Sequence, residues 1–129
     1  MLKTYNPAAI SSSRSNYSHA VEVPPGARTL YISGQVPVAA DASTPEGVED
    51  QVALAFENLQ TVLTEAGMGL DDVVRVNAYL TDEAWFPAFR DHRNRLFTGH
   101  KAASTAVAVA ALAHPQFKVE IEAVAAKVD

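Results

Sequence analysis

The sequence contains no cysteine, and this absence excludes several kinds of site at once. A disulfide framework, a thiolate zinc centre and a cysteine nucleophile all need that side chain. Basic residues are also in the minority, because 10 Lys and Arg stand against 15 Asp and Glu and give a net charge of −5. Proteins that bind nucleic acid usually carry clustered positive charge, so we expect no nucleic-acid partner.

Long apolar runs are missing at the start of the chain. The first 18 residues read MLKTYNPAAISSSRSNYS, without the apolar stretch of about 7 to 15 residues that a secretory signal needs. We therefore expect a cytoplasmic protein with no membrane partner. The four histidines, at positions 19, 92, 100 and 114, show no H-E-x-x-H spacing, and we expect no metal site.

The composition is that of a folded chain. Hydrophobic residues make up 48% of 129 residues, with only 6 Gly and 7 Pro, which excludes collagen-like and disordered classes. A chain of this length is close to the commonest size of one domain. We expect a single domain over residues 1–129.

Two segments have the apolar spacing of amphipathic helices. In residues 52–66 the apolar side chains recur every three or four positions, and Gly67 is well placed to end the helix. Ser43 is the expected N-cap of this helix, with Glu46 three residues later. A second helix is expected to open at residues 81–83 and to end near Gly99. The stripe of that second helix consists of Phe86, Phe89, Arg93, Leu96 and Phe97.

The remaining segments resemble strands. Residues 18–23 and 28–33 flank Pro24-Pro25-Gly26 and predict a hairpin, while residues 73–80 alternate with a period of two. Two further strands are expected at residues 105–112 and 117–126. The order ββαβαββ predicts an α+β domain whose sheet is mixed or antiparallel, with two helices on one face.

The fifth strand predicts self-association. It reads TAVAVAAL and is almost entirely alanine and valine. Because both helices are expected on one face of the sheet, the other face is left without a cover. A second copy of the chain would bury such an apolar surface.

Four stretches carry a resemblance to a known family. They are YSHAV at residues 17–21, SGQVP at 33–37, the run from ENLQTVL to AYLTD at 57–82, and VEIEAVA at 119–125. Their order and spacing resemble the Rid (YjgF/YER057c/UK114) family over nearly the whole chain. The resemblance implies a chorismate-mutase-like fold and a homotrimer with clefts between subunits. It also implies hydrolysis of imines and enamines to 2-keto acids and ammonia, without cofactor or metal.

Four residues match positions that the resemblance assigns to the site. Glu120 matches the glutamate that holds the hydrolytic water, and Tyr17 matches a cleft tyrosine. Ser33 and Gly34 match a strand end that lines the cleft. Taken alone, the strand pattern favours Glu120 as one of two solvated carboxylates with Glu122, and an isolated tyrosine is more often a packing residue.

The chain departs from the family pattern at the residue that binds the substrate carboxylate. The family places an arginine before the fifth strand, whereas this chain has Ala102-Ala103-Ser104-Thr105, with Ser104 at that position. A serine hydroxyl has no charge and cannot replace a planar guanidinium. Arg90 aligns with a cleft position and is the residue we expect to replace the missing anchor. The simpler interpretation of Arg90 is a surface arginine.

These features predict a specialised Rid-family enzyme that acts on an imine or enamine by hydrolysis or tautomerisation. Its catalytic residues would be Glu120 and Tyr17, and a small anionic ligand would contact Ser33, Gly34, Arg90 and Ser104. The alternative is a non-catalytic trimer that binds a small ligand for regulation. Endoribonuclease activity is a third hypothesis, which the acidic composition disfavours.

Overall fold

The computed structural model describes residues 2–11 and 16–129. Short 3₁₀ turns precede β4 and α2, at Leu70–Asp72 and Glu83–Trp85. The strands and helices are β1 (Lys3–Tyr5), β2 (Ala20–Glu22), β3 (Arg28–Gln35), α1 (Val48–Glu65), β4 (Val73–Leu80), α2 (Phe86–Leu96), β5 (Ala103–Ala108) and β6 (Val119–Lys127).

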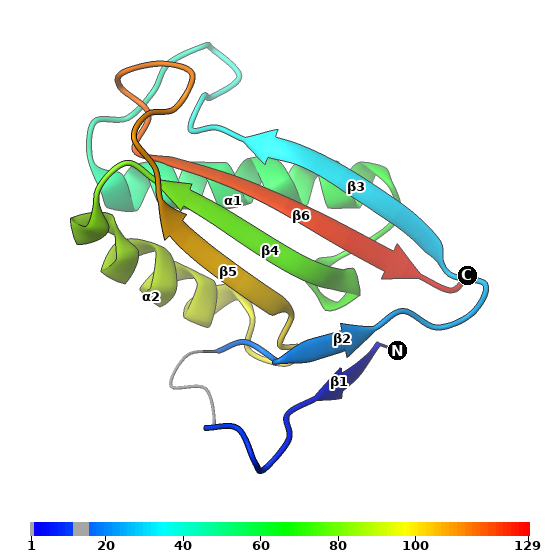
Figure 1. Ribbon diagram of the computed structural model, residues 1–129. Coiled ribbons are helices and arrows are strands. Elements are labelled where there is room, and N and C mark those ends of the chain that lie inside the picture. Colours follow the sequence, from blue (N-terminus) through cyan, green and yellow to red (C-terminus); the bar gives the residue numbers. More distant parts are fainter. Residues whose placement is uncertain (1, 12–15) are drawn as a thin grey trace.

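A four-stranded mixed sheet in the order β3-β6-β4-β5 forms the centre of the fold (Figure 1). Strand β6 is antiparallel to both neighbours, and β4 and β5 are parallel. Strands β1 and β2 form a separate antiparallel pair. This pair meets the edge of β5 where the Ser18 amide donates to the Ala102 carbonyl at 2.9 Å.

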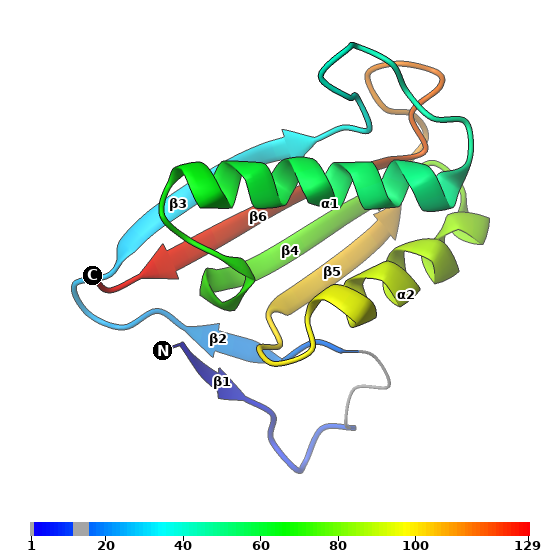
Figure 2. The same ribbon diagram turned by 180° about the vertical axis from the view of Figure 1, so that it is seen from behind.

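Both helices lie on one face of the sheet, as Figures 1 and 2 show from opposite sides. The apolar side chains that recur in residues 52–66 form the buried face of α1. On this face Phe56 stacks on Phe89 of α2, with ring centroids 5.9 Å apart. Alternate residues of β4 and β6 complete this core, among them Val76 and Ile121. The predicted α+β architecture with two helices on one face is confirmed.

The predicted hairpin between residues 18–23 and 28–33 is wrong. Strands β2 and β3 belong to different sheets, and β2 pairs with β1 at Lys3–Tyr5, a strand that the sequence reading missed. The turn itself is present, since Gly26 has φ +79° and the Ala27 amide bonds to the Pro24 carbonyl at 3.3 Å. A three-residue strand such as β1 is too short to show a period of two.

Two predicted element ends also differ. Ser43 does not cap α1, because its amide and hydroxyl both donate to Asp41 Oδ1, at 3.0 and 2.6 Å. That local turn competes with capping, and the helix starts after Gly47. The fifth strand runs over Ala103–Ala108 and ends before the predicted residue 112, since its pairing partner β4 ends at Leu80. In the described residues no helix is long and apolar enough to cross a bilayer.

Candidate functional site

The register of the sheet divides the predicted site residues between its two faces. Ser104 pairs with Val76, whose side chain is in the core beneath the helices. Glu120 pairs with Tyr79 and lies on the helix-free face. Paired residues in neighbouring strands point to the same side of a sheet. One copy of the chain therefore holds two separate groups of predicted site residues.

The first group is built around Gly34 and Glu120. Pairing shifts between Ile32 and Gln35, so that Ser33 and Gly34 of β3 occupy an irregularity opposite β6. Bulges of this kind redirect side chains and are frequent beside active sites. A Cβ at Gly34 would lie 2.7 Å from Cδ and 2.8 Å from Cγ of Glu120. The Glu120 side chain thus occupies space that is open only because residue 34 has no side chain.

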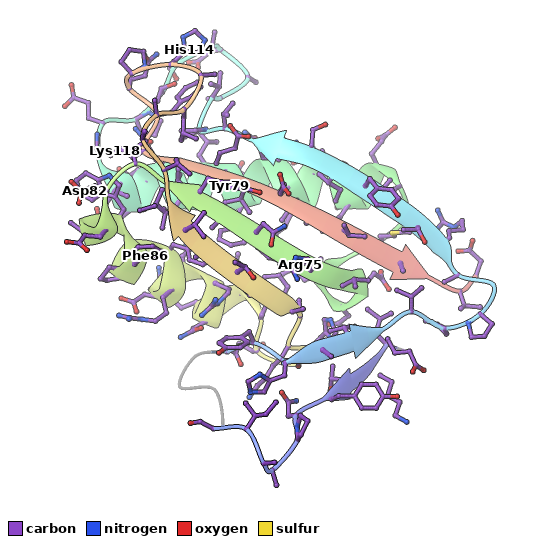
Figure 3. The ribbon with its side chains drawn as sticks, in the orientation of Figure 1. Arg75, Tyr79, Asp82, Phe86, His114 and Lys118 are labelled. Atoms are coloured by element: carbon purple, nitrogen blue, oxygen red, sulfur yellow. The ribbon has the colours of Figure 1, made fainter. Side chains whose placement is uncertain are left out.

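Polar side chains connect the strands next to Glu120. Arg75 donates from Nε to Asn77 Oδ1 and from Nη2 to Thr105 Oγ1, both at 2.9 Å. Asn77 Nδ2 then donates to Glu122 Oε2 at 3.2 Å. These interactions cross β5, β4 and β6 on the helix-free face, and Figure 3 shows Arg75 and Tyr79 on that face. Glu122 is held in the network, which leaves Glu120 as the carboxylate beside Gly34.

Tyr79 adds a hydroxyl to this face. Burial raises the pKa of Tyr79 above its ordinary value of 10.0. The Glu122 carboxylate, which accepts a hydrogen bond from the phenol, and the charge of Glu120 raise that pKa further, while Arg75 opposes them. A neutral phenol at physiological pH can donate a hydrogen bond but carries no charge.

The second group lies between α2 and the start of β5. Here Arg93 of α2 donates from Nη1 to Ser104 Oγ at 3.1 Å. The Arg93 Cζ atom lies 5.8 Å from the centre of the half-buried Tyr17 ring and 5.2 Å from the centre of the Phe89 ring. Ser104 and Tyr17, which the sequence predicted as site residues, are thus brought together by a third residue.

Sequence reasoning missed Arg93, which it placed only in the packing stripe of the second helix. The residue is 6% exposed, and burial lowers the pKa of its guanidinium. Tyr17 opposes this shift, and the charge of Arg90 adds to it. An arginine inside an apolar stripe is the signal that could have identified it, because charged residues are rarely buried without a partner.

Arg90 occupies a different environment. Its side chain is half exposed, and Nε lies 3.6 Å from Asp91 Oδ1. Within residues 2–11 and 16–129, it forms no hydrogen bond or ion pair with Tyr17, Ser104 or Glu120. Its role as an anion-binding residue stays a prediction. No cluster of three or more His, Asp or Glu side chains suited to a metal ion occurs among the residues described.

Comparison with known proteins gives consistent matches over nearly the whole chain. The family model described as Endoribonuclease L-PSP matches residues 7–127. Protein HMF1 of Saccharomyces cerevisiae is 38% identical over 124 residues, which cover 95% of this chain and 90% of that protein. The 2-iminobutanoate/2-iminopropanoate deaminase of Mus musculus is 37% identical over 124 residues, covering 95% and 86%.

A solved structure matches closely as well. It is the crystal structure of YyfB, a conserved Rid-family protein of unknown function from Yersinia pestis. The TM-score is 0.88 at 33% sequence identity, and the match covers 96% of this chain and 97% of that one.

Proposed function

Because the chain belongs to the Rid family, whose model Endoribonuclease L-PSP spans residues 7–127, we propose that it hydrolyses small imines and enamines. The products are a carbonyl compound and ammonia. The observation that carries this proposal is the position of Glu120, whose carboxylate lies beside the Cβ-less Gly34 on the helix-free face. The similar mouse protein is named for deamination of two imino acids, which supports the same reaction class.

The reaction needs one water and one group that exchanges protons. The water oxygen bonds to the imine carbon, the carbon–nitrogen bond breaks, and both water hydrogens leave on nitrogen as ammonia. The Glu120 carboxylate accepts a proton from the attacking water and returns it to the departing nitrogen. An enamine reaches the same path after it gains a proton on carbon and loses one from nitrogen.

The site is completed by a second copy of the chain. The group at Gly34 and Glu120 and the group at Tyr17 and Ser104 lie on opposite faces of one sheet, so one small molecule cannot contact both. The proposed homotrimer brings the first group of one copy to the second group of its neighbour. Tyr31 is 80% exposed and Val107 is 41% exposed. Both lie on the helix-free face, where a neighbouring copy would cover them.

Ser104 gives the proposed enzyme its specialised scope. The hydroxyl already accepts a hydrogen bond from Arg93, and serine supplies neither charge nor a two-pronged donor to a substrate carboxylate. The same observation favours the second candidate function, a trimer that binds a small ligand without reaction. The two functions differ in a single measurable property, the rate of imine hydrolysis above the rate in buffer.

The test uses 2-iminopropanoate generated in situ from alanine by an amino-acid oxidase in the presence of catalase. The imine that remains is trapped with semicarbazide, and the ammonia released is measured in parallel. We expect the wild-type protein to accelerate ammonia release and Glu120→Gln to reduce the acceleration by roughly 100-fold or more. Glu57→Gln, an exposed carboxylate on α1, is the matched control. Wild-type protein no faster than buffer would overturn the enzymatic proposal and leave ligand binding.

A further inference from the structure

The guanidinium of Arg93 is a buried cation between α2 and β5. The Arg93 side chain is more than nine-tenths buried, and no carboxylate forms an ion pair with it in the described part of the chain. Residues 12–15 read SSRS and carry no carboxylate either. An isolated charge is costly to bury, and the positive charge of Arg90 adds to this cost by lowering the pKa of the Arg93 guanidinium. The local electrostatics therefore favour an anion at this position.

Arg93 presents two hydrogen-bond donor atoms, Nε and Nη2, on one edge of its guanidinium. Nη1 donates to Ser104 Oγ at 3.1 Å, and Nη2 makes a long 3.4 Å interaction with Asn94 Oδ1. Nε is buried and has no hydrogen-bond partner among residues 2–11 and 16–129. Nε and Nη2 point along the same edge of the planar group, and a carboxylate can accept from such a pair through both oxygens.

Neighbouring residues hold this edge in a fixed orientation. The rings of Phe89 and Tyr17 lie against the guanidinium, with centres 5.2 and 5.8 Å from Cζ. Ser104 restrains Nη1 from the side of β5. An arginine that is fixed before binding loses little conformational freedom when a ligand arrives, which favours recognition of a small anion.

We propose that Arg93 binds the carboxylate of a small 2-oxo or 2-imino acid through Nε and Nη2. Helix α2 thus supplies the cation that β5 lacks at Ser104. This inference rests on the proposed function for the identity of the ligand. The site offers one guanidinium, with the uncharged side chains of Ser104 and Tyr17 beside it. One positive charge matches the single negative charge of a carboxylate, whereas phosphate sites usually contain several cations.

The first experiment measures binding without turnover. Calorimetry with 2-oxobutanoate should show binding to the wild-type protein, and the uncharged analogue 2-butanone should bind far more weakly. Arg93→Met should weaken binding of 2-oxobutanoate roughly 10- to 100-fold, since one charge-assisted pair is lost. Arg95→Met, an exposed arginine on the same helix, is the matched control. Inorganic phosphate is the second probe, and phosphate bound more tightly than 2-oxobutanoate would overturn the choice of ligand.

A relocation variant separates binding from a purely structural role. Arg93→Met combined with Ser104→Arg moves the guanidinium from α2 to β5 while keeping one arginine in this place. We expect the double variant to regain most of the lost affinity. A structural role for Arg93, limited to joining α2 and β5, predicts no change in affinity for any variant that folds.

A measurement on the wild-type protein keeps the inference testable if the variants fail to fold. The ¹⁵N resonance of Arg93 Nε, identified by its absence from Arg93→Lys or by through-bond assignment, should shift as 2-oxobutanoate is added. An unmoved resonance at saturation, or binding lost in Arg90→Ala but kept in Arg93→Met, would overturn the assignment. Because no reaction is measured, failure of this inference is distinguishable from failure of imine hydrolysis.

Discussion

Replacement of Gly34 by alanine tests the position of Glu120 directly. The added Cβ would lie 2.7 Å from Cδ and 2.8 Å from Cγ of Glu120, and it would overlap Oε2. Carbon atoms in favourable contact are separated by about 3.5 to 4.0 Å. The Glu120 carboxylate must therefore move by about 1 Å in Gly34→Ala.

The size of the effect follows from this displacement. A misplacement of about 1 Å in a reacting group can lower a rate roughly 100-fold, so we expect kcat for imine hydrolysis to fall by that factor. The cost in stability should be smaller. The backbone of Gly34 does not have a positive φ, and moving a flexible glutamate off its rotamer costs about 0.5 to 1.5 kcal/mol.

The assay is ammonia release from 2-iminopropanoate, combined with thermal unfolding of each variant. Gly69→Ala is the matched control, because a Cβ at that glycine meets nothing within 4 Å. In a Glu120→Ala background, Gly34→Ala should change neither the residual rate nor the stability appreciably, since the clashing side chain is absent. A folded Gly34→Ala protein with wild-type kcat would refute the reasoning.

Four further outcomes are expected. Sedimentation at micromolar concentration should show a trimer, and a monodisperse monomer would contradict the intersubunit site. Ser104→Arg alone should lower the unfolding temperature, because the new guanidinium meets Arg93 Nη1, which lies 3.1 Å from the present hydroxyl; an unchanged temperature would argue against this contact. Gln51→Leu should cost roughly 3 kcal/mol or more, measured by urea unfolding, because the Gln51 amide bonds three backbone groups at 2.7 to 2.8 Å; a loss below 1 kcal/mol would contradict it. Burial and the charge of Arg95 lower the pKa of His92 below 6.5. The unfolded chain therefore binds this proton more readily than the folded one, so the neutral His92 leaves stability undiminished above pH 6.5 and the folded state loses stability as the pH falls below 6.5. Unfolding temperatures at pH 7.5 and 5.0 should differ less in His92→Gln than in the wild type, and an equal difference would exclude His92 as a cause.

Local patterns predicted the elements whose evidence lies within a few residues. The apolar stripe of α1 fixed its buried face, and Gly67, with φ +71°, ends it as expected. The alternation of β4 likewise identified its core side. The resemblance to the Rid family assigned Gly34 and Glu120 to the same site, and the structure shows the two in contact. These features depend on side-chain periodicity or on a short motif, both of which are readable from the chain.

Other features depended on partners that are distant in the sequence. The hairpin prediction failed because β2 pairs with β1 and not with the strand that follows it. The Ser43 cap failed because Asp41 offered a competing acceptor. Arg93 could not be related to Ser104 from spacing alone, since a residue in a helix stripe is expected to pack against whatever the sheet presents.

The sequence by itself determined the composition class, the two amphipathic helices, the alternating strands and the family motifs. Each of these is a property of neighbouring residues and of the helix or strand period. Only the tertiary structure decided which strands pair, on which face of the sheet each site residue lies, and that a guanidinium from α2 is buried against Ser104 and Tyr17. The physical reason is that register and burial arise from contacts between segments far apart in the chain, and the pattern of one helix does not show which residues of the sheet a buried charge will meet.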